Sequence, residues 1–87
     1  MQFADFSGMK PLTKSEKKII ELMGKKLKEL RKEKGYTSYE TFAFDNEINR
    51  MQYWRMEKGL SNMSIATLLR VLEVHKMSLK DFFADFK

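Results

Sequence analysis

The side chains with the clearest chemistry form a cationic and polar set within one short stretch. Arg50, Met51, Gln52, Arg55 and Lys58 combine guanidinium, thioether, amide and ammonium groups. At helical spacing, positions 51, 55 and 58 form one stripe, and positions 50 and 54 form the stripe beside it. Such a face suits the DNA major groove, where guanine offers two acceptors to arginine and thymine offers a methyl group. The alternative is a solvated surface helix without a ligand.

A helix beginning after Asn49 is expected to present this set. Asn49 is a suitable N-cap, and Gln52 three residues later completes a capping-box pattern. Tyr53 and Met56 share the opposite face, and Ile48 precedes the cap as a hydrophobic staple. We therefore expect the side with Tyr53 and Met56 to be buried and the arginine side to remain open.

A second short helix and a sharp turn are expected just before this one. Thr37 opens a capping-box pattern that is completed by the glutamate three residues later. Phe42 and Ala43 are expected to point inward, and Ala43 is small enough for a neighbouring helix to come close. The turn follows at residues 45–47. Asn46 is the residue expected to adopt left-handed backbone there, because asparagine tolerates it.

A long helix is expected to precede this pair. Thr13 and Glu16 form a capping box at its start, and Gly35 supplies a left-handed stop at its end. Gly24 lies inside the pattern, where it costs about 1 kcal/mol relative to alanine, and marks either a close helix approach or a bend. The expected buried stripe consists of Ile20, Met23, Leu27 and Leu30, widened by Ile19 and Leu22.

Two more helices are expected after the loop at residues 60–63, with Ser64 and Ser78 as their caps. The sequence thus predicts an all-α fold, a compact bundle of about five helices containing a helix-turn-helix. One domain over residues 13–87 follows an N-terminal arm over residues 1–12. Inward positions of the last two helices are expected to be Ile65, Leu68, Leu69, Val71, Leu72, Leu79, Phe82 and Phe83.

Composition excludes several classes of protein. The 87 residues make one domain, and without cysteine the chain has neither disulfides nor thiolate metal sites. The single histidine, His75, cannot build a zinc site with its neighbours. The chain lacks a secretory signal and an apolar run of about 20 residues, so a cytoplasmic protein away from the membrane is expected. It also lacks a phosphate loop and a nucleophile beside a histidine, so we expect no enzyme, metal or cofactor.

The net charge of +5 is unevenly distributed. Residues 10–34 contain ten Lys or Arg and four Asp or Glu, whereas residues 35–87 contain seven of each kind. A basic half indicates a polyanionic partner such as nucleic acid. The alternative is a lysine-rich helix face that serves solubility.

From about Gly24 to Phe83 the chain resembles the phage-repressor and Cro-type family of helix-turn-helix proteins, which is lambda-repressor-like in fold and is also called the xenobiotic-response-element family. The spacing from Ala43 through Ile48 and Glu57 to Gly59 is as in that family. The matching segments are LKELRKEKGYT, then FA before the turn, INRMQYWRMEKG, and SIATLLRVLEVHKMSLKDFF.

The resemblance implies sequence-specific binding of double-stranded DNA by a small transcriptional regulator or mobile-element repressor, with a recognition helix at about 49–58. It implies a structural ion pair between Arg31 and Glu57, and a homodimer on a palindromic site. For Arg55 the alternative is a surface ion pair with Glu47 or another acid, and for Tyr39 it is simple packing. By position, base contacts fall to Arg50, Met51, Gln52 and Arg55, and phosphate contacts to Ser38, Tyr39, Lys58 and Asn62.

The chain departs from the family pattern at several positions. Glu47 replaces the glycine of the turn, and Tyr39 stands where glutamine is common. Trp54 replaces a small residue, and packs either onto backbone or against the long first helix. His75 and Lys76 replace a leucine and a glycine, and His75 is expected to be a partly buried core residue.

A second function class is a protein-interaction module, for example an antitoxin that binds a partner protein and its own promoter. The arm and the aromatic residues near both termini favour this alternative, whereas the arginine face favours DNA. The dimer surface is expected at the final helix and the terminal aromatics, Phe3, Phe6 and Phe86.

Overall fold

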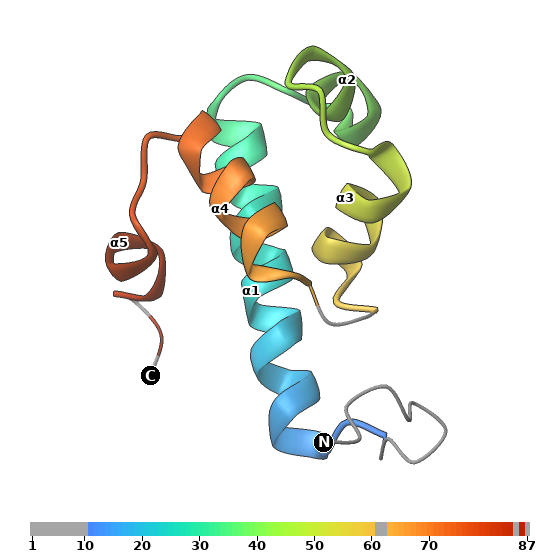
Figure 1. Cartoon of the computed structure of the whole chain (residues 1–87), viewed down its shortest axis with the longest axis vertical. Coiled ribbons are helices and arrows are strands. Elements are labelled where there is room, and N and C mark those ends of the chain that lie inside the picture. The colour runs from blue at the N-terminus through green and yellow to red at the C-terminus, as the bar shows by residue number, and fades with distance from the viewer. Residues whose placement is uncertain (1–10, 61–62, 85, 87) are drawn as a thin grey trace.

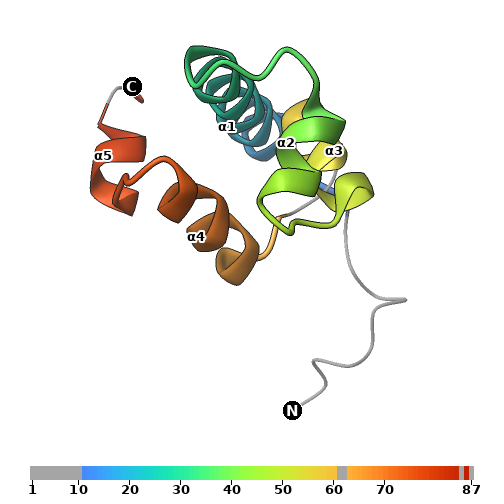
Figure 2. The same ribbon diagram turned by 90° about the horizontal axis from the view of Figure 1, so that it is seen from above.

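The computed structural model describes residues 11–60, 63–84 and 86 of the chain. This part of the chain is all-helical and contains no strand, as the sequence predicts. α1 forms the long axis, α2 and α3 lie on one side of it, α5 lies on the other side, and α4 lies across α1 between them (Figures 1 and 2). The five helices are α1 (Lys14–Glu33), α2 (Tyr39–Asp45), α3 (Arg50–Lys58), α4 (Ile65–Val74) and α5 (Leu79–Phe83).

Two parts of the prediction lie outside the described residues. Residues 1–10 account for most of the expected arm and include Phe3 and Phe6. Asn62, expected to contact phosphate, falls in the second gap.

Both ends of α1 are determined by local sequence. The Glu16 N–H donates to the Thr13 hydroxyl at 3.1 Å, and the Thr13 N–H donates to the Glu16 carboxylate at 2.9 Å, which is the predicted capping box. At the other end Gly35 has a φ of 101°, and its N–H donates to the Lys32 carbonyl at 2.9 Å. Gly35 therefore ends the helix as predicted. The predicted caps of α4 and α5 are also present, at Ser64 and Ser78.

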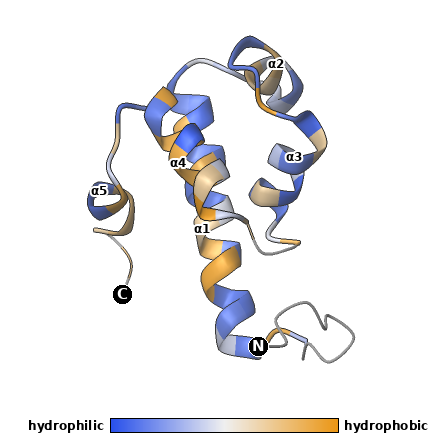
Figure 3. Cartoon of the chain, in the orientation of Figure 1, coloured by the Kyte–Doolittle hydropathy of each residue, from blue (hydrophilic) through white to orange (hydrophobic). Residues whose placement is uncertain are grey.

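A single hydrophobic cluster joins all five helices. Figure 3 shows hydrophobic residues along α1 and α4, whereas the ribbon of α3 is mostly hydrophilic. α3 therefore reaches the core through few side chains. The buried members of the cluster are Leu27, Phe42, Ala43, Ile48, Tyr53, Met56, Leu68, Val71, Leu72 and Phe82.

Four hydrophobic residues of α1 and α4 that were expected in the core are exposed instead. Ile19 and Leu22 of α1 are 48% and 40% exposed, because the N-terminal half of α1 extends beyond the other helices (Figure 1). Ile65 and Leu69 of α4 are 60% and 45% exposed. They lie four residues apart on an outward strip, since the neighbours of α4 cover only its other side.

The C-terminal aromatics form a local cluster at α5. Phe82 is buried, but Phe83, also predicted to return to the core, is exposed. Its ring meets those of Phe82 and Phe86 edge-on at centroid distances of 5.1 and 5.0 Å. Phe86 thus packs within its own chain.

Gly24 marks a close approach of helices rather than a bend. A Cβ atom at this position would lie 2.5 Å from the carbonyl oxygen of Met56 and 2.6 Å from that of Glu57. Both carbonyls belong to the last turn of α3, so the backbones of α1 and α3 meet here. Gly59, just after α3, has a φ of 65°, and a Cβ there would lie 3.0 Å from the Cα of Glu21. The two glycines let α3 approach α1 more closely than any side chain would allow.

Arg31 and Glu57 form a bidentate ion pair across the same junction. The Arg31 Nε donates to Glu57 Oε2 at 2.7 Å and Nη2 donates to Oε1 at 3.1 Å, while Nη1 donates to the Tyr36 carbonyl at 2.9 Å. The two side chains are 5% and 6% exposed. The hydrogen bond to Glu57 raises the pKa of Arg31 above its ordinary value. One guanidinium therefore joins α1, the loop before α2, and α3.

His75 is half-buried at the end of α4, as predicted. Its ring stacks on Phe42 with centroids 5.5 Å apart and an interplanar angle of 9°. Its buried Nε2 atom has no hydrogen-bond partner within the described residues. Burial, with the positive charge of Lys34 as a second cause, lowers the pKa of His75, against a smaller opposing effect of Glu33. The neutral imidazole is the form that suits this position.

We predict that Glu57→Ala will lower the free energy of unfolding by about 3–5 kcal/mol, because it leaves a buried arginine without its counter-charge. Urea unfolding followed by circular dichroism measures this loss. The control is Glu73→Ala, an exposed acid on α4, expected to change stability by about 0.5 kcal/mol or less. An unchanged melting temperature for Glu57→Ala would show that the pair is not structural.

We also predict that stability falls as the pH is lowered from about 7.5 to 5.5, in part through His75. The unfolded chain binds a proton near the ordinary pKa of 6.5, whereas the folded chain resists protonation. The contribution of His75 is therefore full above pH 6.5 and is lost as the pH falls through and below it. Urea unfolding at both pH values should show a smaller difference for His75→Leu, and an equal difference would contradict the assignment.

Candidate nucleic-acid interface

The turn between α2 and α3 is built around Glu47, not around Asn46 as predicted. Glu47 has a φ of 57°, whereas Asn46 has a φ of −106°. The reason is that Asn46 closes α2, where its Nδ2 donates to the Phe42 carbonyl at 2.8 Å. The left-handed backbone conformation therefore falls on the next residue, Glu47, at the position where the phage-repressor and Cro-type family has glycine. The turn is closed by the Ile48 N–H, which donates to the Ala43 carbonyl at 2.9 Å.

α2 is capped by Ser38, so the predicted capping box opened by Thr37 is wrong by one residue. The Ser38 hydroxyl accepts from the N–H groups of Glu40 and Thr41 at 3.1 and 3.3 Å. The Ser38 hydroxyl, one residue after Thr37, reaches the same free N–H groups at the start of the helix. Thr37 and Ser38 therefore compete as caps. Ser38 and Tyr39 are both half-buried, and Tyr39 packs against the core cluster.

α3 has the orientation that the sequence predicts. The Asn49 side chain accepts from the Gln52 N–H at 2.9 Å and begins the helix. Tyr53 and Met56 are 0% and 3% exposed, and Ile48 before the cap is also buried. Burial raises the pKa of Tyr53, and the Glu57 carboxylate raises it further, so its phenol stays neutral inside the core. The opposite face is exposed along its length, at Arg50, Met51, Gln52, Arg55 and Lys58.

Neighbours of this face distinguish its two arginines. Within the described residues, no ion pair joins Arg55 to Glu47 or to another acid. Arg50 instead lies beside Glu40 of α2, with Nη1 3.6 Å from Oε2. Trp54, next to this face, is half-buried.

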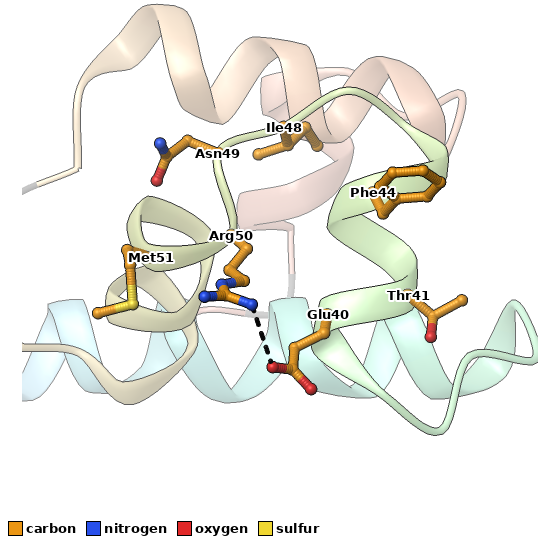
Figure 4. A pocket seen from close by; sticks show the side chains of 7 residues that line it. All are labelled: Glu40, Thr41, Phe44, Ile48, Asn49, Arg50 and Met51. Carbon is orange, nitrogen blue, oxygen red and sulfur yellow. Dashed lines mark ion pairs between the residues drawn. The ribbon is translucent and has the colours of Figure 1, made fainter.

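A groove of about 800 Å³ lies between α2 and α3. Figure 4 shows that Arg50 and Glu40 point toward each other across it. Phe44, on the outer side of α2, is 84% exposed. The lining residues are Glu40, Thr41, Phe44, Ile48, Asn49, Arg50 and Met51.

Sequence reasoning missed Glu40 and Phe44 as parts of this groove. Phe44 follows two inward residues at 100° steps around a helix, so its outward position could have been inferred. Glu40 carries no such signal, because its approach to Arg50 depends on the angle between two helices.

The described residues hold no group of three or more His, Cys, Asp or Glu side chains arranged to bind a metal ion. None of the helices in the described ranges is long and apolar enough to cross a membrane. The candidate site consists of the exposed face of α3 and the groove beside it, in which Glu40 is the acidic side chain.

Comparison with known proteins gives a relative of the same size class. Over 64 residues the chain is 36% identical to "Control protein C.MunI" from a Mycoplasma species, a match that covers 74% of this chain and 86% of the relative. No protein-family model and no solved structure matches. The chain therefore belongs to the family of this control protein and is a regulator of the helix-turn-helix kind.

Proposed function

We propose that the protein is a sequence-specific double-stranded DNA-binding protein that regulates transcription by placing α3 in the major groove. The observation that carries this proposal is the division of α3 into two faces. Tyr53 and Met56 anchor one face in the core, and the other face is open along the whole helix. The kinship with a control protein supports a role in regulation.

Four of the exposed side chains of α3 each suit a base edge in the major groove. Arg50 and Arg55 suit guanine, whose N7 and O6 accept two hydrogen bonds from one guanidinium. Gln52 suits adenine, and Met51, which is 48% exposed, suits a thymine methyl group. Each good bidentate pair contributes about 1–3 kcal/mol of discrimination.

Phosphate contacts are proposed for the groups that flank these base contacts. Lys58 lies exposed in the last turn of α3. Ser38 and Tyr39 lie at the start of α2, at the positions to which the family resemblance assigns phosphate contacts. Such contacts fix the register of the protein on the duplex without reading sequence. Asn62 is proposed for the same role from the family resemblance alone.

Selection of bound DNA from a random pool tests this function. Arg50→Ala and Arg55→Ala should each relax preference at a particular base pair, by about fivefold or more. Lys58→Ala should weaken binding to all sequences alike. Arg70→Ala, an exposed arginine on α4, is the matched control and should leave the selected sequence unchanged. A uniform loss for both α3 arginines would mean that they contact only phosphate.

We further propose that two copies bind a palindromic site, with the outward strip of α4 and the end of α5 as the dimer surface. Leu69 of α4 is 45% exposed and Phe83 of α5 is 37% exposed, and large apolar side chains left exposed favour association. Two recognition helices would then meet half-sites about one helical turn apart.

Leu69→Glu is expected to convert the dimer to a monomer in sedimentation velocity experiments, because the new charge is buried between copies on association. Ile19→Glu, at a residue that is 48% exposed on the free half of α1, is the control and should leave the dimer intact. A monomeric wild-type chain, or a dimer that survives Leu69→Glu, would contradict this surface.

A further inference from the structure

We infer that Glu40 is a positioning residue that holds the Arg50 guanidinium for one base and keeps it from the phosphates. The inference rests on the proposed function and deepens it, since it assigns base specificity to a contact between α2 and α3. Its basis is the placement of a carboxylate beside the first arginine of α3, with Oε2 3.6 Å from Nη1 (Figure 4).

An acid at this place is unfavourable for simple DNA affinity. A carboxylate within the DNA-facing groove repels phosphate and opposes the attraction that most contacts to a duplex provide. Glu40 is 56% exposed in its side chain, and Arg50 is 64% exposed. In water an exposed pair of this kind contributes little to folding stability. The position of Glu40 is therefore explained better by recognition than by stability.

The geometry leaves Arg50 able to read a base. A guanidinium has five N–H groups in a planar fork, and two of them suffice for guanine O6 and N7. The pair with Glu40 is made through Nη1, so the N–H groups of Nε and Nη2 remain for the two acceptors of guanine. A carboxylate on one side of the Arg50 guanidinium restricts the rotation of this long side chain. The restriction favours one bidentate geometry on the base.

The pair is expected to strengthen when DNA covers the groove. At 3.6 Å in water the attraction between Glu40 and Arg50 is weak. When the duplex excludes water, the local dielectric constant falls and this attraction becomes stronger. Without the carboxylate, the freed guanidinium would turn to the nearest phosphate and bind without regard to sequence. The expected result of losing Glu40 is therefore tighter nonspecific binding with poorer discrimination.

Glu40 also lies in the first turn of α2, where a negative charge favours the helix N-terminus. This structural role predicts a small loss of stability on substitution, without any change in base preference. Base preference is therefore the measurement that separates the two roles.

The test combines selection from a random DNA pool with binding to a scrambled duplex at several salt concentrations. We expect Glu40→Gln to reduce the preference at the base pair that depends on Arg50 by about threefold to tenfold, and to leave other positions unchanged. Binding to the scrambled duplex should become tighter, with a steeper salt dependence. Glu40→Asp keeps the carboxylate and should therefore retain part of the base preference that Glu40→Gln loses. Glu47→Gln removes an exposed negative charge from the adjacent turn, and as the control it should leave preference intact.

A second measurement separates positioning from direct reading by Glu40. In an Arg50→Ala background, Glu40→Gln should have no further effect on preference. A further loss would mean that Glu40 itself accepts a hydrogen bond from a base, and would overturn the positioning role. Unchanged preference for Glu40→Gln in the wild-type background would overturn it as well. A wild-type protein with no sequence preference would instead refute the proposed function itself.

Discussion

The junction between the second half of α1 and the last turn of α3 is the constraint on which the interface depends. α3 has nine residues, too few for a stable helix on its own, and it buries only two large side chains from its own length. Close backbone contact at Gly24 and the buried pair of Arg31 with Glu57 supply the rest. Both act at the C-terminal end of α3, while Ile48 anchors the chain just before its N-terminus. The exposed face between these two anchors is held without any side chain of that face taking part.

Arg31 also links this junction to α2. Its third hydrogen bond goes to the Tyr36 carbonyl in the loop that leads to Ser38. The same side chain thus restrains the start of α2 and the end of α3. Glu40 and Arg50 lie on these two helices, so the contact between them depends on how α2 and α3 pack, to which this buried pair contributes. This arrangement explains why a buried, charged contact is suited to the position: its directional hydrogen bonds specify geometry, which apolar packing alone would leave looser.

Much of the fold could be predicted from the sequence because local signals and burial agree. The Thr13 capping box, the Gly35 stop and the spacing of Tyr53 and Met56 each depend on a few neighbouring residues. Predictions failed where two residues compete for one role or where a distant element decides. Ser38 displaced Thr37 as a cap, and Glu47 took the left-handed position because Asn46 was engaged in closing α2. Exposure along α1 and α4 also could not be read from spacing, since it depends on which helices cover which side.

Charge illustrates the same limit for the candidate site. The excess of lysine in the first half of the chain indicated a polyanionic partner, but Lys18, Lys25 and Lys26 line a groove with Met77 and Phe86, the residues that flank α5. α5 itself lies on the side of α1 away from α3 (Figure 2). Glu40 of α2, in contrast, lies in the groove beside Arg50 of the proposed reading face. Net charge can increase the rate of encounter with DNA within about a Debye length, but it cannot select a base pair. Selection requires a few side chains held in fixed directions, and here those directions follow from the packing of α3 on α1 and α2. The informative signal in this sequence was therefore the two-faced pattern of one short helix, not the overall charge.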